Sequence, residues 1–320
     1  MKRRTFLELL GVMLATRVSG ASGAFAQSGA VRVVVPLPAG SSNDVVARVL
    51  TAQMRHSLGE SFIVDNKAGS NGVIGTMDVL RAAPDGQTLL LASNSPLATN
   101  TAFVKNMPYD PRRDLTPISG VSLTNHVLMV GSTSPIMTFR EFITYAKERP
   151  GKVTVGYSTT SVQLQIATLN KLAGTRLLAV AYKGSPEAIN DVISGMLDAT
   201  LTDPGNAVVH AKGGQLRALA VSSLKRNPIT PDWPAVSETL PGFDFPSWNA
   251  LVGPAGMPRE LVDRLSSAVI QAQRQRDVVE RLAIHGTVPM IMGPDELKAF
   301  MDAETAKWVR LAREANIQPE

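Results

Sequence analysis

The chain has 320 residues, enough for one large domain or two of moderate size, with no cysteine and a formal net charge of +5. Its 44% hydrophobic and 18% charged residues are typical of a globular protein and exclude a long disordered chain. Without cysteine there is no disulfide, thiolate metal site, iron–sulfur cluster or cysteine nucleophile, and such a chain suits an oxidising compartment.

Residues 1–26 are predicted to be a cleaved export signal. A basic cluster precedes a mildly apolar stretch that ends in Ala24-Phe25-Ala26, a small-x-small cleavage site. Arg3-Arg4-Thr5-Phe6-Leu7 is typical of a twin-arginine signal, and the ordinary secretory route stays open. The segment carries +3 (four basic residues against Glu8), so +2 remains for a mature chain that starts at Gln27. That charge gives no support to a nucleic-acid partner, and no run reaches the roughly 20 apolar residues of a membrane anchor.

From residue 31 on, short apolar runs alternate with segments of helical periodicity. A helix is predicted at residues 43–57, and strands are predicted at residues 31–35, 89–92, 127–130, 153–157, 177–182 and 216–221. Runs that are mostly continuous, rather than alternating with polar residues, indicate strands that are buried on both faces. With helices between them, the pattern predicts an α/β fold of mostly parallel sheets flanked by helices.

Several helices have recognisable starts. Thr138 with Glu141 three residues later predicts a capping box, followed by an apolar face that begins at Phe139. Ser185 is predicted to cap the next helix, with Pro186 at its first position. A stripe near the C-terminus predicts a long helix packed on the core through Leu297, Phe300, Met301, Trp308, Leu311 and Ala315.

The sequence has no low-complexity linker, charge run or short repeat, so a domain boundary must be a crossing of ordered chain. The segments proposed for the crossings are residues 119–127 outward and the Pro- and Trp-rich residues 228–248 on the return. The prediction is therefore a first lobe of residues 27–125 plus 249–320 and a second lobe of residues 126–248.

Common catalytic and cofactor motifs are missing. His56, His126, His210 and His285 do not pair at metal-ligand spacing, and each is predicted to be a surface or core histidine. The glycines of residues 69–75 lack the spacing of a dinucleotide fingerprint and predict a turn with tight helix packing. Ser222-Ser223-Leu224-Lys225 matches S-x-x-K without its companion motifs and predicts a loop. We therefore expect no metal, no cofactor and no catalytic residue.

Polar turns at two strand ends are the strongest candidates for function. Residues 38–44 follow the first strand and open a helix, and residues 158–161 do the same after a later strand. Free N–H groups at a helix N-terminus, together with hydroxyls, bind anions such as carboxylates. The alternative is that Asn43 and the hydroxyl clusters only cap their helices. Asp44 must be turned away from such an anion, capped, or bridged to it through water.

A series of short motifs runs in order along residues 31–320, each weak alone and strong together. The motifs are Val33-Val34-Val35-Pro36-Leu37-Pro38-Ala39-Gly40 with Asp44 and Ala47-Arg48, Asp65-Asn66-Lys67-Ala68-Gly69 with Gly72 and Ile74-Gly75, Pro84-Asp85-Gly86-Gln87-Thr88-Leu89, Ala181-Tyr182-Lys183-Gly184, Gly214-Gln215-Leu216-Arg217-Ala218-Leu219-Ala220-Val221, Pro241-Gly242-Phe243, Trp248-Asn249 and Gly253-Pro254-Ala255-Gly256-Met257-Pro258. Together they resemble the Bug-type receptors, the extracytoplasmic solute-binding proteins of the tripartite tricarboxylate transporter family.

The resemblance implies a two-lobed periplasmic-binding-protein fold of the type II kind, with the ligand in the cleft and no catalysis. It implies a periplasmic, monomeric receptor that captures a small organic carboxylate by hinge closure and presents it to the permease subunits of a membrane transporter. A receptor for a membrane signalling partner is an open alternative. An exported hydrolase that uses Asp44 or a cleft serine is another, although the missing nucleophile–base motifs argue against it.

In the family, the loop after the first strand and the loop opening the second-lobe helix hold a ligand carboxylate, partly through water. Carried over with three further strand ends, the expected ligand-binding residues are Leu37, Ala39, Gly40, Ser41, Ser42, Asn43, Asp44, Ser93, Asn94, Tyr157, Ser158, Thr159, Thr160, Ser161, Tyr182, Lys183, Gly184, Thr202 and Asp203. Leu37 replaces the family's usual phenylalanine, and residues 41–42 and 158–161 replace glycine-richer turns, so the family's ligand geometry is not carried over.

Overall fold

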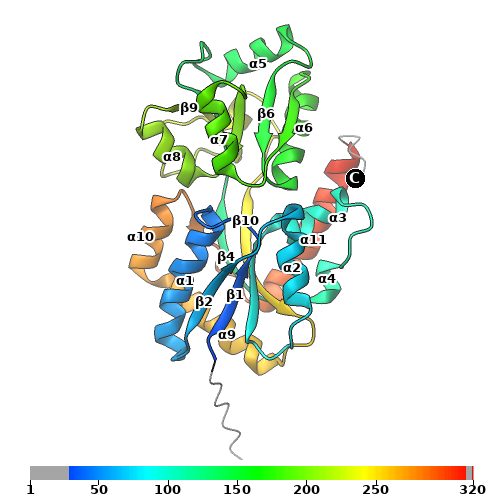
Figure 1. Cartoon of the computed structure of the whole chain (residues 1–320), viewed down its shortest axis with the longest axis vertical. Coiled ribbons are helices and arrows are strands. Elements are labelled where there is room, and N and C mark those ends of the chain that lie inside the picture. The colour runs from blue at the N-terminus through cyan, green and yellow to red at the C-terminus, as the bar shows by residue number, and fades with distance from the viewer. Residues whose placement is uncertain (1–28, 315–318, 320) are drawn as a thin grey trace, which may run out of the picture.

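The computed structural model describes residues 29–314 and residue 319. The predicted signal segment and Ala315 lie outside this part of the chain. The described chain forms two sheets with their helices, stacked along the long axis of the molecule (Figure 1). We call these the first lobe, built on the six-stranded sheet, and the second lobe, built on the five-stranded sheet.

The first lobe contains both ends of the described chain. Its sheet has the strand order β11 (Val288–Pro289), β4 (Leu115–Thr124), β10 (Ser247–Pro254), β3 (Thr88–Ser93), β1 (Val31–Val35) and β2 (Phe62–Asn66). Its helices are α1 (Ser42–Leu58), η1 (Ser70–Gly72), α2 (Val73–Leu80), η2 (Ser95–Thr99), α3 (Asn100–Phe103), α4 (Pro111–Asp114), α9 (Arg259–Arg274), α10 (Arg276–Ile284) and α11 (Pro294–Glu314).

The second lobe is the smaller one. Its sheet has the strand order β7 (Leu178–Ala181), β6 (Thr154–Tyr157), β8 (Ala199–Thr202), β5 (Val127–Gly131) and β9 (Leu216–Val221). Its helices are α5 (Phe139–Glu148), α6 (Thr160–Ala173), α7 (Ser185–Ser194) and α8 (Pro204–Lys212), and the 3-10 helix η3 (Val236–Glu238) follows β9. No helix in residues 29–314 is long and apolar enough to cross a membrane.

The predicted strands and the predicted helix at residues 43–57 are all present, within one or two residues of their predicted ends. One inference from them was wrong: the apolar run that forms β7 is largely exposed. β7 pairs only with β6 and forms an edge of its sheet, so a continuous apolar run did not mean burial on both faces.

Most strands of each sheet run in one direction, but both sheets also contain antiparallel pairs. β1 pairs in parallel with β2 and β3, and β6 pairs in parallel with β7 and β8. β10 is antiparallel to both of its neighbours, and so is β5. Each of these two strands carries the chain in from the other lobe. It therefore starts at the junction of the lobes, where the neighbouring strands end. The direction of a strand could not be predicted from the sequence, because hydrophobic periodicity is the same in both directions.

The helix caps follow the sequence with two differences. Thr138 Oγ1 accepts from Glu141 N at 3.2 Å, but Glu141 Oε2 accepts from Met137 N rather than from the backbone of Thr138. α7 begins at Ser185, so its cap is Gly184 and not the predicted Ser185. Glu187 Oε2 accepts from Gly184 N at 3.0 Å and replaces the serine hydroxyl as the capping group.

The glycine-rich segment is a turn with tight packing, as predicted. Gly69 and Gly72 have φ of +132° and +86°, in the region that favours glycine. A Cβ on Gly75 would lie 2.9 Å from Lys67 O and from Pro36 Cβ, so the start of α2 packs closely on the end of β1.

The chain crosses between the lobes twice. It leaves the first sheet after β4, passes through Asn125 and His126, and enters β5; it returns between β9 and β10. Asn125 Nδ2 donates to Ser223 Oγ at 3.1 Å, which ties the two crossings together. The lobe boundaries at residues 125–126 and 248–249 stay a prediction.

α11 packs along the first lobe and its predicted stripe is in the core, with Leu297, Met301 and Trp308 buried. Glu304 Oε2 accepts from the indole N–H groups of Trp248 and Trp308, each at 2.9 Å. Phe245, in the return crossing, lies 5.7 Å from Trp308 between ring centroids. These aromatic residues belong to one hydrophobic cluster that spans both lobes and the return crossing, and each lobe has a second cluster of its own.

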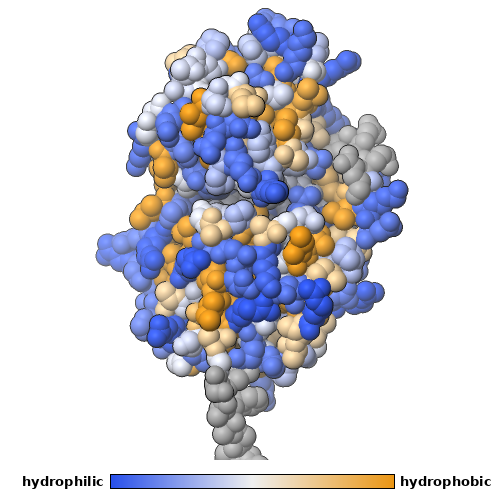
Figure 2. Space-filling view, in the orientation of Figure 1, coloured by the Kyte–Doolittle hydropathy of each residue, from blue (hydrophilic) through white to orange (hydrophobic). Residues whose placement is uncertain are grey.

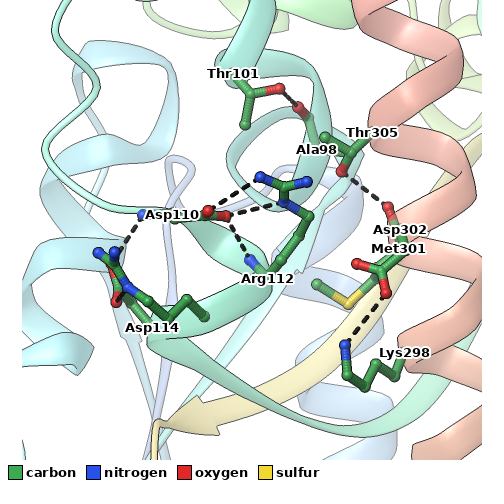
Figure 3. Close-up of polar contacts among 10 residues, drawn as sticks. Ala98, Thr101, Asp110, Arg112, Asp114, Lys298, Met301, Asp302 and Thr305 are labelled. Atoms are coloured by element: carbon green, nitrogen blue, oxygen red, sulfur yellow. Dashed lines mark hydrogen bonds and ion pairs between the residues drawn. The ribbon is translucent and has the colours of Figure 1, made fainter.

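The segment that leads from η2 to β4 lies against α11 (Figure 3). Asp110 caps α4 by accepting from Arg112 N at 3.0 Å, and its carboxylate also accepts from the Arg112 guanidinium. On α11, Lys298 pairs with Asp302 one turn later. These are local, partly exposed ion pairs on the outer surface of the first lobe.

Candidate functional site

A cavity lies at the junction of the lobes, where the carboxyl ends of β1, β3, β6 and β8 face one another. The surface is hollowed at this junction (Figure 2). It is lined by Leu37, Pro38, Ser41, Ser42, Asn43, Ser93, Thr124, His126, Ser158, Thr159, Ser161, Gly184, Ser185, Pro186, Leu201, Asp203 and Ser247. The first turns of α1, α6 and α7 reach this lining, so several helix N-termini converge on one space.

The α1 wall is a tight loop closed by its own helix. Gly40 has φ of +80°, and its N–H donates to Asp44 Oδ2 at 3.0 Å. Ser41 is the N-cap and accepts from Asp44 N at 3.4 Å. The N–H groups of Ser42 and Asn43 have no acceptor among the described residues. Two donors of the first turn of a 17-residue helix are therefore available at the cavity.

Asp44 does not line the cavity, and its charge is compensated. Its carboxylate accepts from Arg48 Nε at 3.0 Å and lies 2.9 Å from Arg48 Nη2. Burial disfavours the charged form of Asp44, but the hydrogen bonds from Arg48, Gly40 and Asn66 outweigh it and hold the pKa of this carboxyl below its usual range. Asp44 is thus an ionised group turned toward its own loop and Arg48.

The α6 wall faces the α1 wall from the second lobe. Thr159 is the N-cap residue but its side chain caps nothing; its Oγ1 lies 3.0 Å from Ser161 Oγ. The N–H of Thr160 has no acceptor among the described residues. Ser161 N donates to Ser95 Oγ of the first lobe at 3.4 Å. The first turn of α6 therefore offers a free N–H and two hydroxyls.

The starts of α7 and α8 complete the second-lobe wall. Asp203 is the N-cap of α8 and accepts from Asn206 N at 3.1 Å and from Asn206 Nδ2 at 2.7 Å. Tyr182 is turned away: its hydroxyl donates to Asp191 at 2.7 Å, and burial together with that carboxylate raises the pKa of the phenol to about 12. The neighbouring Lys183 does not reach the lining either.

Across this site the two lobes are in contact. Thr160 Oγ1 donates to Asn100 Oδ1 at 2.8 Å, and Ser95 Oγ lies 3.3 Å from Ser161 Oγ. A Cβ on Gly184 would lie 3.1 Å from Pro38 Cγ. The structure is therefore a closed form.

Sequence reasoning placed some of these residues and missed others. Ten of the nineteen expected residues line the cavity. The other nine are close in sequence but outside the lining: Ala39, Gly40, Asp44, Asn94, Tyr157, Thr160, Tyr182, Lys183 and Thr202. The lining residues absent from the expected set are Pro38, Thr124, His126, Ser185, Pro186, Leu201 and Ser247. Pro38 belongs to the expected loop. Thr124, His126 and Ser247 lie where the chain crosses between lobes, and the predicted crossing segments were the signal that could have found them.

The cavity is notable for the charges in its lining. It contains one acidic residue, Asp203, one histidine, and no lysine or arginine. The described residues also contain no cluster of His, Asp or Glu suited to a metal ion. An anion held here would therefore be held by backbone N–H groups, hydroxyls and amides.

Comparison with known proteins matches the chain to one family. The model of the tripartite tricarboxylate transporter family receptor matches residues 46–317. The chain is 32% identical to protein BugT of Bordetella pertussis over 320 residues, covering 98% of each chain. It resembles the solved structure of Rhodopseudomonas palustris Rpa4515 with adipate, with a TM-score of 0.89 and 28% identity over 92% of this chain and all of that one. It also resembles the structure of MatC from Rhodopseudomonas palustris with bound malate. The TM-score is 0.82 and the sequence identity 29%, over 88% of this chain and 98% of that one.

Proposed function

Because the chain belongs to the tripartite tricarboxylate transporter receptor family of periplasmic solute-binding proteins, we propose that its ligand is a small organic carboxylate. The receptor captures this ligand in the cavity between its lobes and presents it to a membrane transporter. The fold is that of a periplasmic binding protein.

One observation supports the proposal: the first turns of two helices from opposite lobes reach the same cavity. In α1 the N–H groups of Ser42 and Asn43, which line it, have no acceptor among the described residues; in α6 Ser161 lines it, next to Thr160, whose N–H also has none. A helix N-terminus carries roughly half a positive charge. Two such ends stabilise a carboxylate without any cationic side chain, which agrees with the absence of lysine and arginine from the lining.

The two similar solved structures support the ligand class. Their bound ligands are adipate and malate, both small dicarboxylates. For this chain we propose the same class, mono- or dicarboxylates of a few carbons, with one carboxylate at the helix ends.

The proposed mechanism is hinge closure. The donors of α1 and α6 come from different lobes, so a ligand bonds to both only when the lobes are together, and its differential affinity favours the closed form. The crossings at residues 125–126 and 222–246 would serve as the hinge, between lobes of residues 27–125 plus 249–320 and 126–248. The closed surface would then dock on the permease subunits, with the receptor acting as a monomer exported by the signal at residues 1–26.

We propose no catalysis in this cavity. The ring of His126 bonds to Gln165, and no serine that lines the cavity makes a side-chain hydrogen bond to this ring. A nucleophile and its base need such a bond, so the cavity's geometry favours binding over turnover.

The test is isothermal titration calorimetry of residues 27–320 against a panel of small mono- and dicarboxylates, with thermal unfolding measured in parallel. At least one carboxylate should bind and raise the unfolding temperature. If no member of the panel binds and none shifts unfolding, the carboxylate assignment is wrong.

A further inference from the structure

His126 occupies an unusual place for a histidine, in the two-residue crossing between β4 and β5. Its backbone is fixed from both sides: its N–H donates to Ser222 Oγ at 2.8 Å, and its C=O accepts from Ser222 N at 2.8 Å. Ser222 belongs to the return crossing. The ring is therefore held at the point where both crossings meet, and it lines the cavity.

One nitrogen of the ring is occupied and the other is free. Gln165 Nε2 lies 3.0 Å from His126 Nδ1. Among the described residues, nothing bonds to Nε2 of this ring. With the amide nitrogen toward the ring, Gln165 donates and Nδ1 accepts, so the proton of a neutral imidazole resides on Nε2.

Gln165 is built to hold the ring in this state. It lies on α6, is fully buried, and its Oε1 has no partner among the described residues. Burial of a polar side chain without full satisfaction costs free energy, and its amide makes one hydrogen bond, to the histidine. A function for that bond explains why the glutamine stands there.

From this geometry we propose that His126, positioned by Gln165, takes part in selecting the ligand. Its neutral ring N–H donates to a ligand oxygen that does not belong to the carboxylate held at the helix ends. The inference rests on the proposed function and names the second recognition point of the same cavity. It favours a ligand whose second polar group carries an acceptor oxygen, such as a carboxylate or carbonyl, over one with an ammonium group there.

The charges around the ring agree with a neutral donor. Burial alone lowers the pKa of His126 to about 4, and no charged side chain contributes to the shift. Asp203 is the other ionisable group in the lining, and it already accepts two hydrogen bonds from Asn206. A donor-only ammonium would meet the N–H of His126 with no acceptor, whereas an oxygen would complete it.

The first test uses matched ligands of one chain length: a dicarboxylate that binds, its monoamide, and the ω-amino acid in which the second carboxylate is replaced by an ammonium. The wild-type receptor should bind the dicarboxylate and the monoamide at least 10-fold more tightly than the amino acid. The variant His126→Leu should lose roughly 10- to 100-fold in affinity for the dicarboxylate and most of the discrimination. His210→Leu is the matched control, because His210 is partly exposed, lies outside the cavity lining and bonds through its ring to Gln215.

The second test begins with the wild-type receptor. The ¹⁵N shifts of His126 in the free receptor should show a neutral ring protonated on Nε2 at pH 7, and Gln165→Leu should change that distribution. Calorimetry in buffers of different ionisation enthalpy should show no proton uptake on binding at pH 7.5.

The failures are distinguishable. If no carboxylate binds the wild-type receptor, the proposed function fails, while the ¹⁵N shifts still show the protonation state of His126 beside Gln165. If a carboxylate binds but His126→Leu keeps both affinity and discrimination, or if the proton of the free ring is on Nδ1, the inference is overturned.

Discussion

Arg48 Nη2 lies 2.9 Å from Asp44 Oδ1, one turn along α1. Arg48 does not line the cavity, so the charge of the acidic side chain closest in sequence to the proposed anion loop is compensated from outside the lining. The same carboxylate accepts from Gly40 N at 3.0 Å and so shapes the loop that presents Ser41 and Ser42.

Replacing Arg48 by glutamine should therefore weaken both folding and ligand binding. Asp44 is 4% exposed and would keep its charge with fewer partners. The expected loss in the free energy of unfolding is about 1–3 kcal/mol, with a loss of affinity because the unpaired carboxylate repels the anion. Urea unfolding and calorimetry measure the two effects. Arg276→Gln is the control, since it removes an i,i+4 pair of the same kind on exposed α10.

Asp44 also predicts an acid limb in stability. Its pKa is lowered in the folded protein, so its stabilisation is fully present above the unfolded value of about 3.9 and is lost as pH falls through the lower folded value. Between pH 5 and pH 2, Asp44→Asn should show a shallower loss of stability than the wild type. Parallel acid limbs would contradict the assignment.

The hydroxyls on the two walls can be tested together. Ser41→Ala combined with Thr159→Ala should weaken carboxylate binding by roughly 1.5–3 kcal/mol for each bond lost to a charged ligand. The folded state should lose about 1 kcal/mol, because Ser41 caps α1. Ser237→Ala and Thr144→Ala make the matched control, because both hydroxyls bond to backbone carbonyls on exposed surfaces. Unchanged affinity would mean that the backbone N–H groups hold the ligand alone.

Asn43 offers the sharpest test of the sign of the ligand's charge. It is 6% exposed, lines the cavity, and its Nδ2 has no partner among the described residues. Asn43→Asp has nearly the same shape but places a negative charge in the first turn of α1. An anionic ligand should lose at least about 100-fold in affinity at pH 7, whereas folding should change little because the helix N-terminus favours the new charge. Retained binding at pH 7 would argue against an anion at this wall.

Closure itself depends on a small residue. Gly184 faces Pro38 across the junction, where a Cβ would lie 3.1 Å from Pro38 Cγ, and its φ of −159° suits any residue. Gly184→Leu should therefore fold normally but hold the lobes apart. The radius of gyration from small-angle X-ray scattering should rise and carboxylate affinity should fall. Ser194→Leu, at the exposed far end of α7, should change neither.

The local sequence predicted those parts of the fold that depend on neighbours in the chain. The valines of β1 and the cap at Thr138 are examples, because apolar runs and side-chain caps act within a few residues. The directions of β5 and β10 were missed, since they depend on which lobe each strand comes from. The cap of α7 was placed one residue late because Ser185 and Glu187 compete for the same role.

The site follows the same division. Ser41, Ser42 and Asn43 were found because a strand end and a helix start are adjacent in sequence. His126 was interpreted as an ordinary surface or core histidine, because Gln165 is 39 residues away and Ser222 is 96 residues away. No spacing rule connects them; only the fold brings Gln165 and Ser222 next to His126.

The carboxylate of Glu304 joins two of the three tryptophans of the chain across the first lobe. Trp248 stands next to cavity-lining Ser247 at the start of β10, and Trp308 contacts Phe245 of the return crossing. Any movement of the crossings alters the surroundings of both indoles. We therefore expect the intrinsic fluorescence of the protein to change on ligand capture, without a label.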